Sequence, residues 1–231
     1  MAVTEGEPNT VVRPPQSEAG KRMTALIDRF VRWLARHWLA IFNTIVAIFV
    51  ALPFLAPVLM HVGATGAGKL IYFVYMPTCH QLPERSYFLF GPKAVYSETE
   101  LEAMGAMPAG INLLQEEALR YPGNSQIGYK VAFCERDVAI YGSILVGGLV
   151  FGVLRKRGKV RKLPLWGYAL FALPMAIDGF TQLFGLRESD WVLRTITGVL
   201  FGGASVWLAY PFVQEAMDDI LRTTPIHAET H

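Results

Sequence analysis

Four long apolar segments, separated by polar ones, dominate the pattern of hydrophobic positions along the chain. A membrane-spanning helix needs about 20 mostly apolar residues, and residues 38–60, 163–185 and 191–213 meet that requirement. Residues 137–154 form a shorter segment that is almost free of charge. The pattern therefore predicts an all-α, polytopic membrane protein whose core is a bundle of four transmembrane helices.

The segment between the first two spans, residues 61–136, contains a further apolar stretch. Residues 70–77, LIYFVYMP, are too few to cross a bilayer and predict a re-entrant or interfacial segment. Ser97 followed by Glu100 has the pattern of a capping box at a helix start, and a second short helix is expected over residues 111–120. We therefore expect an outer loop that carries a small helical extracytoplasmic cap; a mobile loop is the alternative.

Basic residues set the expected orientation of the membrane domain, residues 38–213. Residues 155–162, RKRGKVRK, contain six basic residues and no acidic one, and such loops face the cytoplasm. Residues 24–37 are typical of an amphipathic basic helix on the inner membrane surface. Four spans place both segments inside, so we expect a plasma-membrane protein with both termini in the cytoplasm. Residues 1–23 are expected to be a disordered polar tail and residues 214–231 a cytoplasmic tail.

Composition supports the membrane interpretation, because only 17% of the residues are charged, against about 25% in soluble domains. A net charge of +2 gives no indication of a nucleic-acid partner. Membrane lipids are the expected partners, and partner subunits of a membrane complex are a further expectation. The two cysteines exclude a dense disulfide scaffold but leave room for one disulfide or one small metal site.

The predicted topology gathers the reactive side chains at the outer mouth of the bundle. Cys79 and His80 lie in the outer loop, and Cys134 and Asp137 lie at the outer end of the second span. An extracytoplasmic compartment favours a Cys79–Cys134 disulfide, whereas cysteine, histidine and carboxylate side chains also bind zinc or another divalent metal. Two unpaired thiols are the third alternative. If the cysteines bind a metal, His80 and Asp137 are the further candidate ligands, although the side chains of adjacent residues diverge.

Ionisable side chains also occur within the predicted spans. Asp178 lies in the outer half of the third span with Gln182 one turn above it, and Arg194 begins the fourth span. Charges in lipid are costly and are paired or functional, so we expect an Asp178–Arg194 contact, direct or through Gln182. An ion pair that only holds the hairpin together is the alternative. His80, Asp137 and Asp178 are the candidate catalytic acid–base groups.

Arginine side chains gather on the same predicted outer face. They are Arg85, Arg136, Arg187 and Arg194. A guanidinium group binds phosphate or carboxylate in a forked geometry, so these arginines, with Gln81 and Gln182, are candidate ligand-binding residues. The alternative is that each arginine pairs with a nearby acid among Glu84, Glu135, Glu188 and Asp190.

Four sequence blocks carry a resemblance to a known family. They are CHQLPERS (79–86), CERDVAIYGS (134–143), DGFTQLFGLRES (178–189) and RTITGVLFG (194–202), in this order. The chain resembles, over roughly residues 40–213, the predicted membrane proteins catalogued as domain of unknown function 2085. The resemblance implies a small helical membrane protein and supplies no activity.

The function that the sequence favours is therefore argued from the site. We expect a polar pocket of Cys, His, Asp and Arg side chains at the extracytoplasmic mouth, which binds an anionic lipid-like or small ligand, with or without a metal. Whether the protein is an enzyme stays open. A disulfide-stapled structural or assembly subunit of a membrane complex is one alternative, and a small permease is another. Glycine pairs at 148–152 and 198–202 predict close helix contacts.

Overall fold

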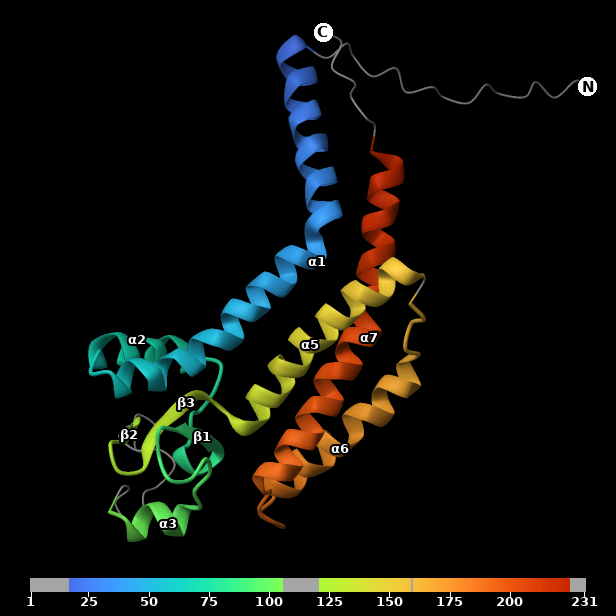
Figure 1. Cartoon of the computed structure of the whole chain (residues 1–231). Coiled ribbons are helices and arrows are strands. Elements are labelled where there is room, and N and C mark those ends of the chain that lie inside the picture. Colours follow the sequence, from blue (N-terminus) through green and yellow to red (C-terminus); the bar gives the residue numbers. More distant parts are fainter. Residues whose placement is uncertain (1–16, 106–120, 159, 225–231) are drawn as a thin grey trace, which may run out of the picture. The chain divides into compact units, whose positions relative to one another are not determined.

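The computed structural model describes residues 17–105, 121–158 and 160–224, and 72% of these residues lie in helices. Within the described residues the α-helices are α1 (Glu18–His61), α2 (Thr65–Tyr75), α3 (Glu98–Ala103), α5 (Glu135–Arg157), α6 (Leu165–Leu183) and α7 (Trp191–Thr223) (Figure 1). A short 3-10 helix, η1 (Pro83–Arg85), and three strands, β1 (Ser86–Leu89), β2 (Gly123–Asn124) and β3 (Gly128–Cys134), lie between α2 and α5.

The described residues divide into two compact units, one that contains residues 17–38 and 216–224 and another that contains the described residues between 39 and 215. In the first unit the Arg32 guanidinium donates hydrogen bonds to the carbonyl oxygens of Leu221, at 3.0 Å, and Thr224, at 2.7 Å. These bonds satisfy carbonyl groups that the end of a helix leaves without a partner. The predicted amphipathic helix is thus a part of α1, continuous with the first predicted span. Most of the predicted N-terminal tail lies outside the described residues.

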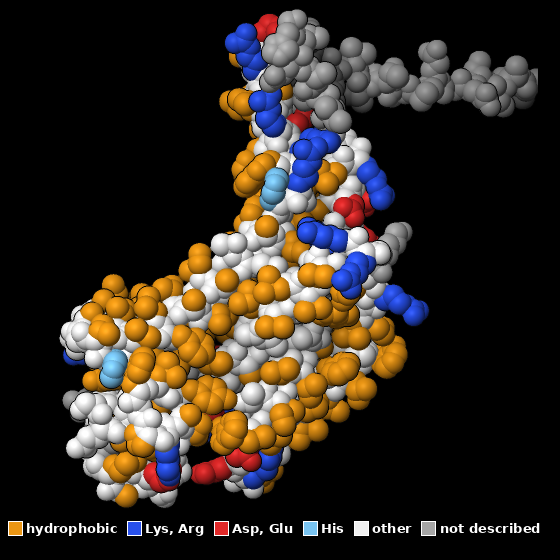
Figure 2. All heavy atoms as spheres, viewed as in Figure 1, with side chains coloured by type: hydrophobic (Ala, Val, Ile, Leu, Met, Phe, Trp, Pro, Cys, Tyr) orange, Lys and Arg blue, Asp and Glu red, His pale blue; other side chains and the backbone are white. Residues whose placement is uncertain are grey.

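Among the described residues, three helices are long and apolar enough to cross a membrane: α1, α5 and α7. They contain the predicted first, second and fourth spans, and each extends beyond the predicted bounds. Helix α6 has 19 residues, includes Pro174 and Asp178, and is not among them, so the third predicted span stays a prediction. Figure 2 shows hydrophobic side chains over the visible faces of these helices, as expected for surfaces in contact with lipid.

The outer loop contains a sheet that the sequence interpretation missed. The three strands are antiparallel in the order β1-β3-β2, and Ser86 of β1 pairs with Cys134 of β3. The predicted capping box of α3 is confirmed, because the Ser97 hydroxyl accepts the Glu100 N–H at 3.2 Å and the Glu100 carboxylate accepts the Ser97 N–H at 3.0 Å. The predicted second helix of the cap lies outside the described residues. The segment that covers this end of the protein is therefore not the purely helical cap that the sequence predicted.

Strand β3 is almost wholly buried, which explains why its residues do not alternate between apolar and polar. Val131, Ala132 and Phe133 are fully buried in one cluster with Tyr72 and Tyr75 of α2. These two tyrosines face the sheet, whereas neighbouring apolar residues of the same helix are exposed. Helix α2 therefore has one face on the sheet and one free apolar face, as expected for the predicted interfacial segment.

Helices α5 and α7 approach closely along a face of small residues. A Cβ atom added at Gly198 would lie 2.8 Å from the Ala139 Cβ, and one added at Gly202 would overlap the Ser143 hydroxyl and the Ile140 carbonyl oxygen. No space for a methyl group exists at either glycine. The predicted glycine seam at 198–202 is thus a helix contact within the chain.

This contact predicts opposite effects for two adjacent substitutions. Gly202→Ala should destabilise the protein by about 1–3 kcal/mol, because the added methyl group forces the helices apart. Gly203→Ala is the matched control, since a Cβ atom there meets nothing within 4 Å, and it should be neutral or stabilising by up to about 1 kcal/mol in a helix. Thermal unfolding in maltoside micelles measures both. Equal effects would contradict the close α5–α7 packing.

Candidate functional site

The junction of β3 and α5 positions two of the candidate residues. Cys134 ends the strand and is the N-cap of the helix, with its sulfur accepting the Asp137 N–H at 3.4 Å. Asp137 therefore lies in the first turn, where the partial positive charge of the helix N-terminus favours an anionic group. The sequence interpretation placed both residues at this end of the second span, and the structure places them there.

The loop after α2 holds Cys79 against this junction. The buried Cys79 sulfur accepts the backbone N–H groups of Cys134, at 3.2 Å, and of Gln81, at 3.4 Å. Gln81 adopts a left-handed backbone conformation with φ of 53°, and its side-chain amide donates to the Tyr72 carbonyl at 2.8 Å. The side chain of Gln81 thus fixes the loop, and its predicted role in ligand binding stays a prediction.

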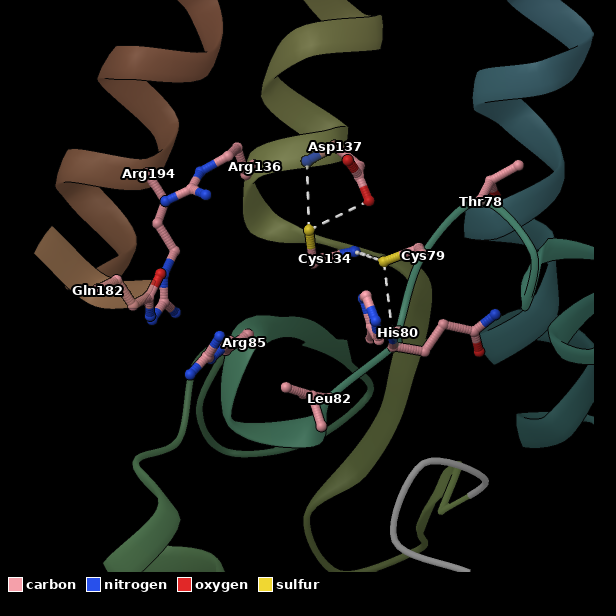
Figure 3. A pocket seen from close by; sticks show the side chains of 11 residues that line it. Thr78, Cys79, His80, Leu82, Arg85, Cys134, Arg136, Asp137, Gln182 and Arg194 are labelled. Atoms are coloured by element: carbon pink, nitrogen blue, oxygen red, sulfur yellow. Dashed lines mark hydrogen bonds between the residues drawn. The ribbon is translucent and has the colours of Figure 1, made fainter. Parts of the chain in front are cut away.

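Three potential metal ligands meet at this point. The Cys79 sulfur, the Cys134 sulfur and a carboxylate oxygen of Asp137 all lie within 4.8 Å of one another, and the Cys134 thiol donates to Asp137 Oδ2 at 3.2 Å. Figure 3 shows the two sulfur atoms and the Asp137 side chain grouped on one wall of a pocket. Both cysteines are free thiols in the structure, so the predicted Cys79–Cys134 disulfide is not formed.

The surroundings of Cys134 favour its protonated form. The hydrogen-bonding contact with the Cys79 sulfur raises the pKa of the Cys134 thiol well above its usual range, and burial and the nearby Asp137 carboxylate raise it further. A cation bound between these groups would reverse that preference, because a metal binds the thiolate and displaces its proton.

A cavity of about 230 Å³ opens beside the three ligands. Its lining consists of Thr78, Cys79, His80, Gln81, Leu82, Arg85, Cys134, Arg136, Asp137, Gln182 and Arg194. In Figure 3, Arg85, Gln182 and Arg194 face the sulfur atoms across this space. His80 is exposed at the cavity but is not one of the three ligands that converge.

The predicted Asp178–Arg194 contact is wrong. Arg194 of α7 donates to Glu135 Oε2 at 3.1 Å, at the start of α5. Asp178 of α6 instead accepts hydrogen bonds from Arg136, at 2.5 Å, and Arg187, at 2.7 Å. The reason is the rotation of α7, whose face containing Arg194 and Gly198 packs on α5 and not on α6.

Asp178 is held by a third donor as well, because the Ser189 hydroxyl lies 2.9 Å from its carboxylate. The Asp178 side chain is 1% exposed and lines neither this cavity nor the other polar cavity at this end of the protein. Its predicted catalytic role therefore gives way to a structural one: it joins α6, the α6–α7 turn and α5.

The alternative interpretation, in which each arginine pairs with one of four named acids, holds for two of the four arginines. Arg85 lies 3.7 Å from Glu84, and Arg136 and Arg187 share Asp178. Several polar atoms nevertheless have no hydrogen-bond partner among the described residues. At this site they are Glu84 Oε2, Glu135 Oε1, Arg136 Nε, Gln182 Nε2 and Arg194 Nε. Buried polar atoms are almost always hydrogen-bonded, so this concentration of unpartnered atoms calls for an explanation such as bound water or an ion.

One residue of the site, Lys130, was missed from the sequence, and Glu135 was named only as a possible partner of an arginine. Lys130 is 1% exposed and donates through Nζ to the Gln81 carbonyl oxygen beneath the cysteine loop. Burial lowers the pKa of Lys130 to about 7. The signal was present in GYKVAFC (128–134), where one lysine interrupts an apolar strand, since a buried lysine always needs a specific partner.

The lowered pKa of Lys130 predicts a pH-dependent stability. In the unfolded chain a lysine loses its proton near pH 10.4, so between about pH 7 and 10 the unfolded state holds more protons and stability rises with pH. The burial penalty is complete below pH 7. Relative to Lys130→Met, the wild-type free energy of unfolding should gain about 1.4 kcal/mol per pH unit between about pH 7.5 and 9.5. Urea unfolding in maltoside micelles measures this difference, and parallel pH profiles would contradict the lowered pKa.

The helices and the site together define a class: a helical membrane protein with a buried cysteine–carboxylate cluster beside arginine–acid pairs. Residues 125–208 match a family described as "Predicted membrane protein (DUF2085)". The chain is also 30% identical over 167 residues to an uncharacterised protein of Methanocaldococcus jannaschii, an alignment that covers 70% of this chain and 83% of that protein. The chain belongs to this family, which confirms the resemblance noted in the sequence. No solved structure matches the chain.

Proposed function

We propose that the protein binds a divalent metal and an anionic small or lipid-like ligand at the extracytoplasmic mouth of its membrane domain. The observation that carries the proposal is the convergence of the Cys79 and Cys134 sulfurs with Asp137 at the edge of a cavity. Two thiolates and one carboxylate suit zinc, and a zinc site with three protein ligands keeps a fourth position for a bound molecule. That position is available to a ligand in the cavity.

The geometry around the sulfurs supports thiolate ligands. The Cys79 sulfur accepts two backbone N–H groups and the Cys134 sulfur accepts one. Hydrogen bonds to a charged acceptor are stronger than those to a neutral one, so these donors stabilise the thiolates that a metal needs. These hydrogen bonds also fix the sulfur positions before any metal binds. The bond from Asp137 to Cys134 lies within the β3–α5 junction, and the bond from Cys134 to Cys79 joins that junction to the loop.

The facing wall supports an anionic ligand. Arg85, Arg136 and Arg194 line the cavity, and Arg136 and Arg194 each retain an Nε–H without a partner among the described residues. A guanidinium group binds phosphate or carboxylate through two N–H groups. A ligand with one anionic oxygen on the metal would place its other oxygens towards these donors. His80, exposed at the same cavity, is the group placed to exchange a proton with such a ligand.

Orientation follows from the two ends of α5. Cys134 precedes its first residue, and Arg155, Lys156 and Arg157 lie in its last turn, so they lie at opposite ends of a helix of 23 residues, which is about 35 Å long at the rise of an α-helix. Because basic turns face the cytoplasm, the cysteine end faces outwards. We infer four spans, including α6, whose exposed face is rich in large apolar side chains, in the plasma membrane with both termini cytoplasmic.

One observation favours a second candidate function, a structural or assembly subunit of a membrane complex. Asp178 has three donors and joins α5, α6 and the turn after α6. A fully paired charge of this kind needs no ligand to explain it. A protein with only this function binds no small molecule, so removing the cluster ligands should have no effect on small-molecule binding.

Binding of glycerol phosphate tests the proposal. Calorimetric titration of the full chain in maltoside micelles should show binding in the presence of zinc that weakens by at least about tenfold after chelation, since a metal ion supplies most of the local positive charge. Arg136→Gln is not a suitable variant for this test, because it would also remove a hydrogen-bond donor from the Asp178 carboxylate. Equal binding with and without zinc would remove the metal from the proposal, and no binding in either state would favour the subunit.

A further inference from the structure

A second polar cavity of about 410 Å³ lies next to the first, and its charge is opposite. It is bounded by η1, the start of α3, the start of α5 and the α6–α7 turn. Six carboxylates line it, against two guanidinium groups: Glu84, Glu98, Glu100, Glu135, Glu188 and Asp190, against Arg85 and Arg194. Lys93 pairs with Glu100, and the surplus of negative charge that remains makes this cavity attractive to a cation.

Buried oxygen atoms at this cavity lack partners, which separates it from an ordinary acidic surface. The Glu135 side chain is 0% exposed, it lines the cavity, and its Oε1 atom has no hydrogen-bond partner among the described residues. Glu84 also lines the cavity, and its buried Oε2 atom likewise has no hydrogen-bond partner among the described residues. A buried carboxylate oxygen without a donor is costly, and a cationic ligand with N–H or polarised C–H groups would remove that cost.

The spacing of the carboxylates decides which kind of cation fits. Among the described residues, Cys79, Cys134 and Asp137 are the group of three such side chains that converges closely enough for a metal ion, and none of them is a carboxylate of this second cavity. A calcium ion needs six to eight oxygen atoms at about 2.3–2.6 Å. The dispersed acids therefore suit a larger cation whose charge is spread over several atoms.

The remaining lining points to an organic ammonium group. Trp191 and Tyr96 contribute aromatic side chains to the cavity, and aromatic rings with carboxylates are the groups that recognise alkylated ammonium ions in proteins. The volume of the cavity exceeds that of the neighbouring one, which leaves room for a substituted ammonium group.

The two cavities share one wall, formed by Arg85, Gln182 and Arg194. On one side are the metal ligands and Arg136, and on the other are the carboxylates. We propose that the acidic cavity binds an organic ammonium group, so that the ligand of the whole mouth is a zwitterion with its anionic group at the cysteine–arginine side. The zwitterionic part of this statement rests on the proposed function, whereas the ammonium site does not.

Choline and glycerophosphocholine test the two parts separately. The full chain in maltoside micelles at low ionic strength is titrated with choline, and Glu98→Gln/Glu188→Gln, two exposed side chains at the rim, should weaken choline binding by about tenfold. Glu215→Gln is the matched control, because it removes an exposed carboxylate of α7 that lies outside both cavities, and it should leave choline binding unchanged. Choline affinity that is equal in wild type and the double variant would overturn the ammonium site.

The zwitterion is tested with the same proteins. With zinc present, glycerophosphocholine should bind at least about tenfold more tightly than either choline or glycerol phosphate, because one molecule then occupies both cavities. In the double variant, glycerophosphocholine should bind no more tightly than glycerol phosphate. If glycerol phosphate binds to the wild type as tightly as glycerophosphocholine does, the proposal of a zwitterionic ligand is wrong. A protein that binds choline but neither zinc nor glycerol phosphate would overturn the proposed function while leaving the ammonium site in place.

Nanodiscs distinguish a lipid from a soluble ligand. If the zwitterion is a lipid headgroup, discs of phosphatidylcholine should suppress binding of added glycerophosphocholine, whereas discs of phosphatidylglycerol should not. A soluble zwitterion should bind equally in both. Absence of binding in phosphatidylglycerol discs would overturn the proposal, because nothing there competes for the ammonium site.

Discussion

Cys134→Ser should lower the affinity of the protein for zinc by about 10²–10³-fold, since a zinc site is worth on the order of 10 kcal/mol and this change removes one of three protein ligands. The substitution is chosen because serine is a good N-cap and can still accept the Asp137 N–H that Cys134 accepts. The start of α5 should therefore stay folded. Competition with a chromophoric chelator measures the affinity in maltoside micelles.

Two further variants show whether the loss is specific to the cluster. Asp137→Asn keeps the shape of the third ligand and should also weaken zinc binding strongly, because a neutral amide is a poor ligand for zinc. His80→Gln is the matched control, since His80 lines the same cavity without joining the three converging ligands, and its zinc affinity should stay within about threefold of wild type. A larger loss for His80→Gln than for Asp137→Asn would mean that the site is assembled differently.

Asp178→Asn should cost about 3–5 kcal/mol of stability, because it leaves Arg136 and Arg187 without their shared countercharge. The Asp178 side chain is 1% exposed, so water cannot replace the lost carboxylate. Thermal unfolding in micelles measures the effect. Asp219→Asn is the matched control: its carboxylate is 70% exposed and pairs with Arg222 on the surface of α7, and such pairs contribute at most about 1 kcal/mol.

A double variant separates an uncompensated charge from lost packing. Asp178→Asn/Arg136→Gln removes both members of one pair, so it should be less destabilised than the sum of the two single variants by about 1–3 kcal/mol. Strict additivity would mean that Asp178 and Arg136 do not interact. The assignment of a structural role to Asp178 would then lose its basis.

Much of the helical framework could be predicted, because a helix that crosses lipid needs about 20 mostly apolar residues. The predicted spans 38–60, 137–154 and 191–213 each fall within a helix that is apolar enough to cross a membrane. The meeting of Cys79 with Cys134 was also expected from the predicted topology, because the outer loop that contains Cys79 leads into the end of the second span at Cys134, opposite the basic turn. Helix α6, which includes Pro174 and Asp178, is not among the described helices that meet this criterion, so its span stays a prediction.

The details of the mouth could not be predicted, for three physical reasons. A strand buried on both faces, such as β3, shows no alternation of apolar and polar residues, so the sheet was missed. The partner of Arg194 depends on the rotation of α7 about its axis, which the adjacency of α6 and α7 does not determine. The carboxylates of the second cavity come from segments as distant as Glu84 and Asp190, and sequence spacing cannot bring them together.

The most direct measurement of the central claim is the zinc content of the purified full chain together with its count of reactive thiols. We predict about one zinc per chain, two thiols protected from alkylation while zinc is bound, and both thiols released by a chelator without any reductant. A metal-free protein whose two cysteines react only after reduction would contradict the account, because the sulfurs would then bind each other and not a metal.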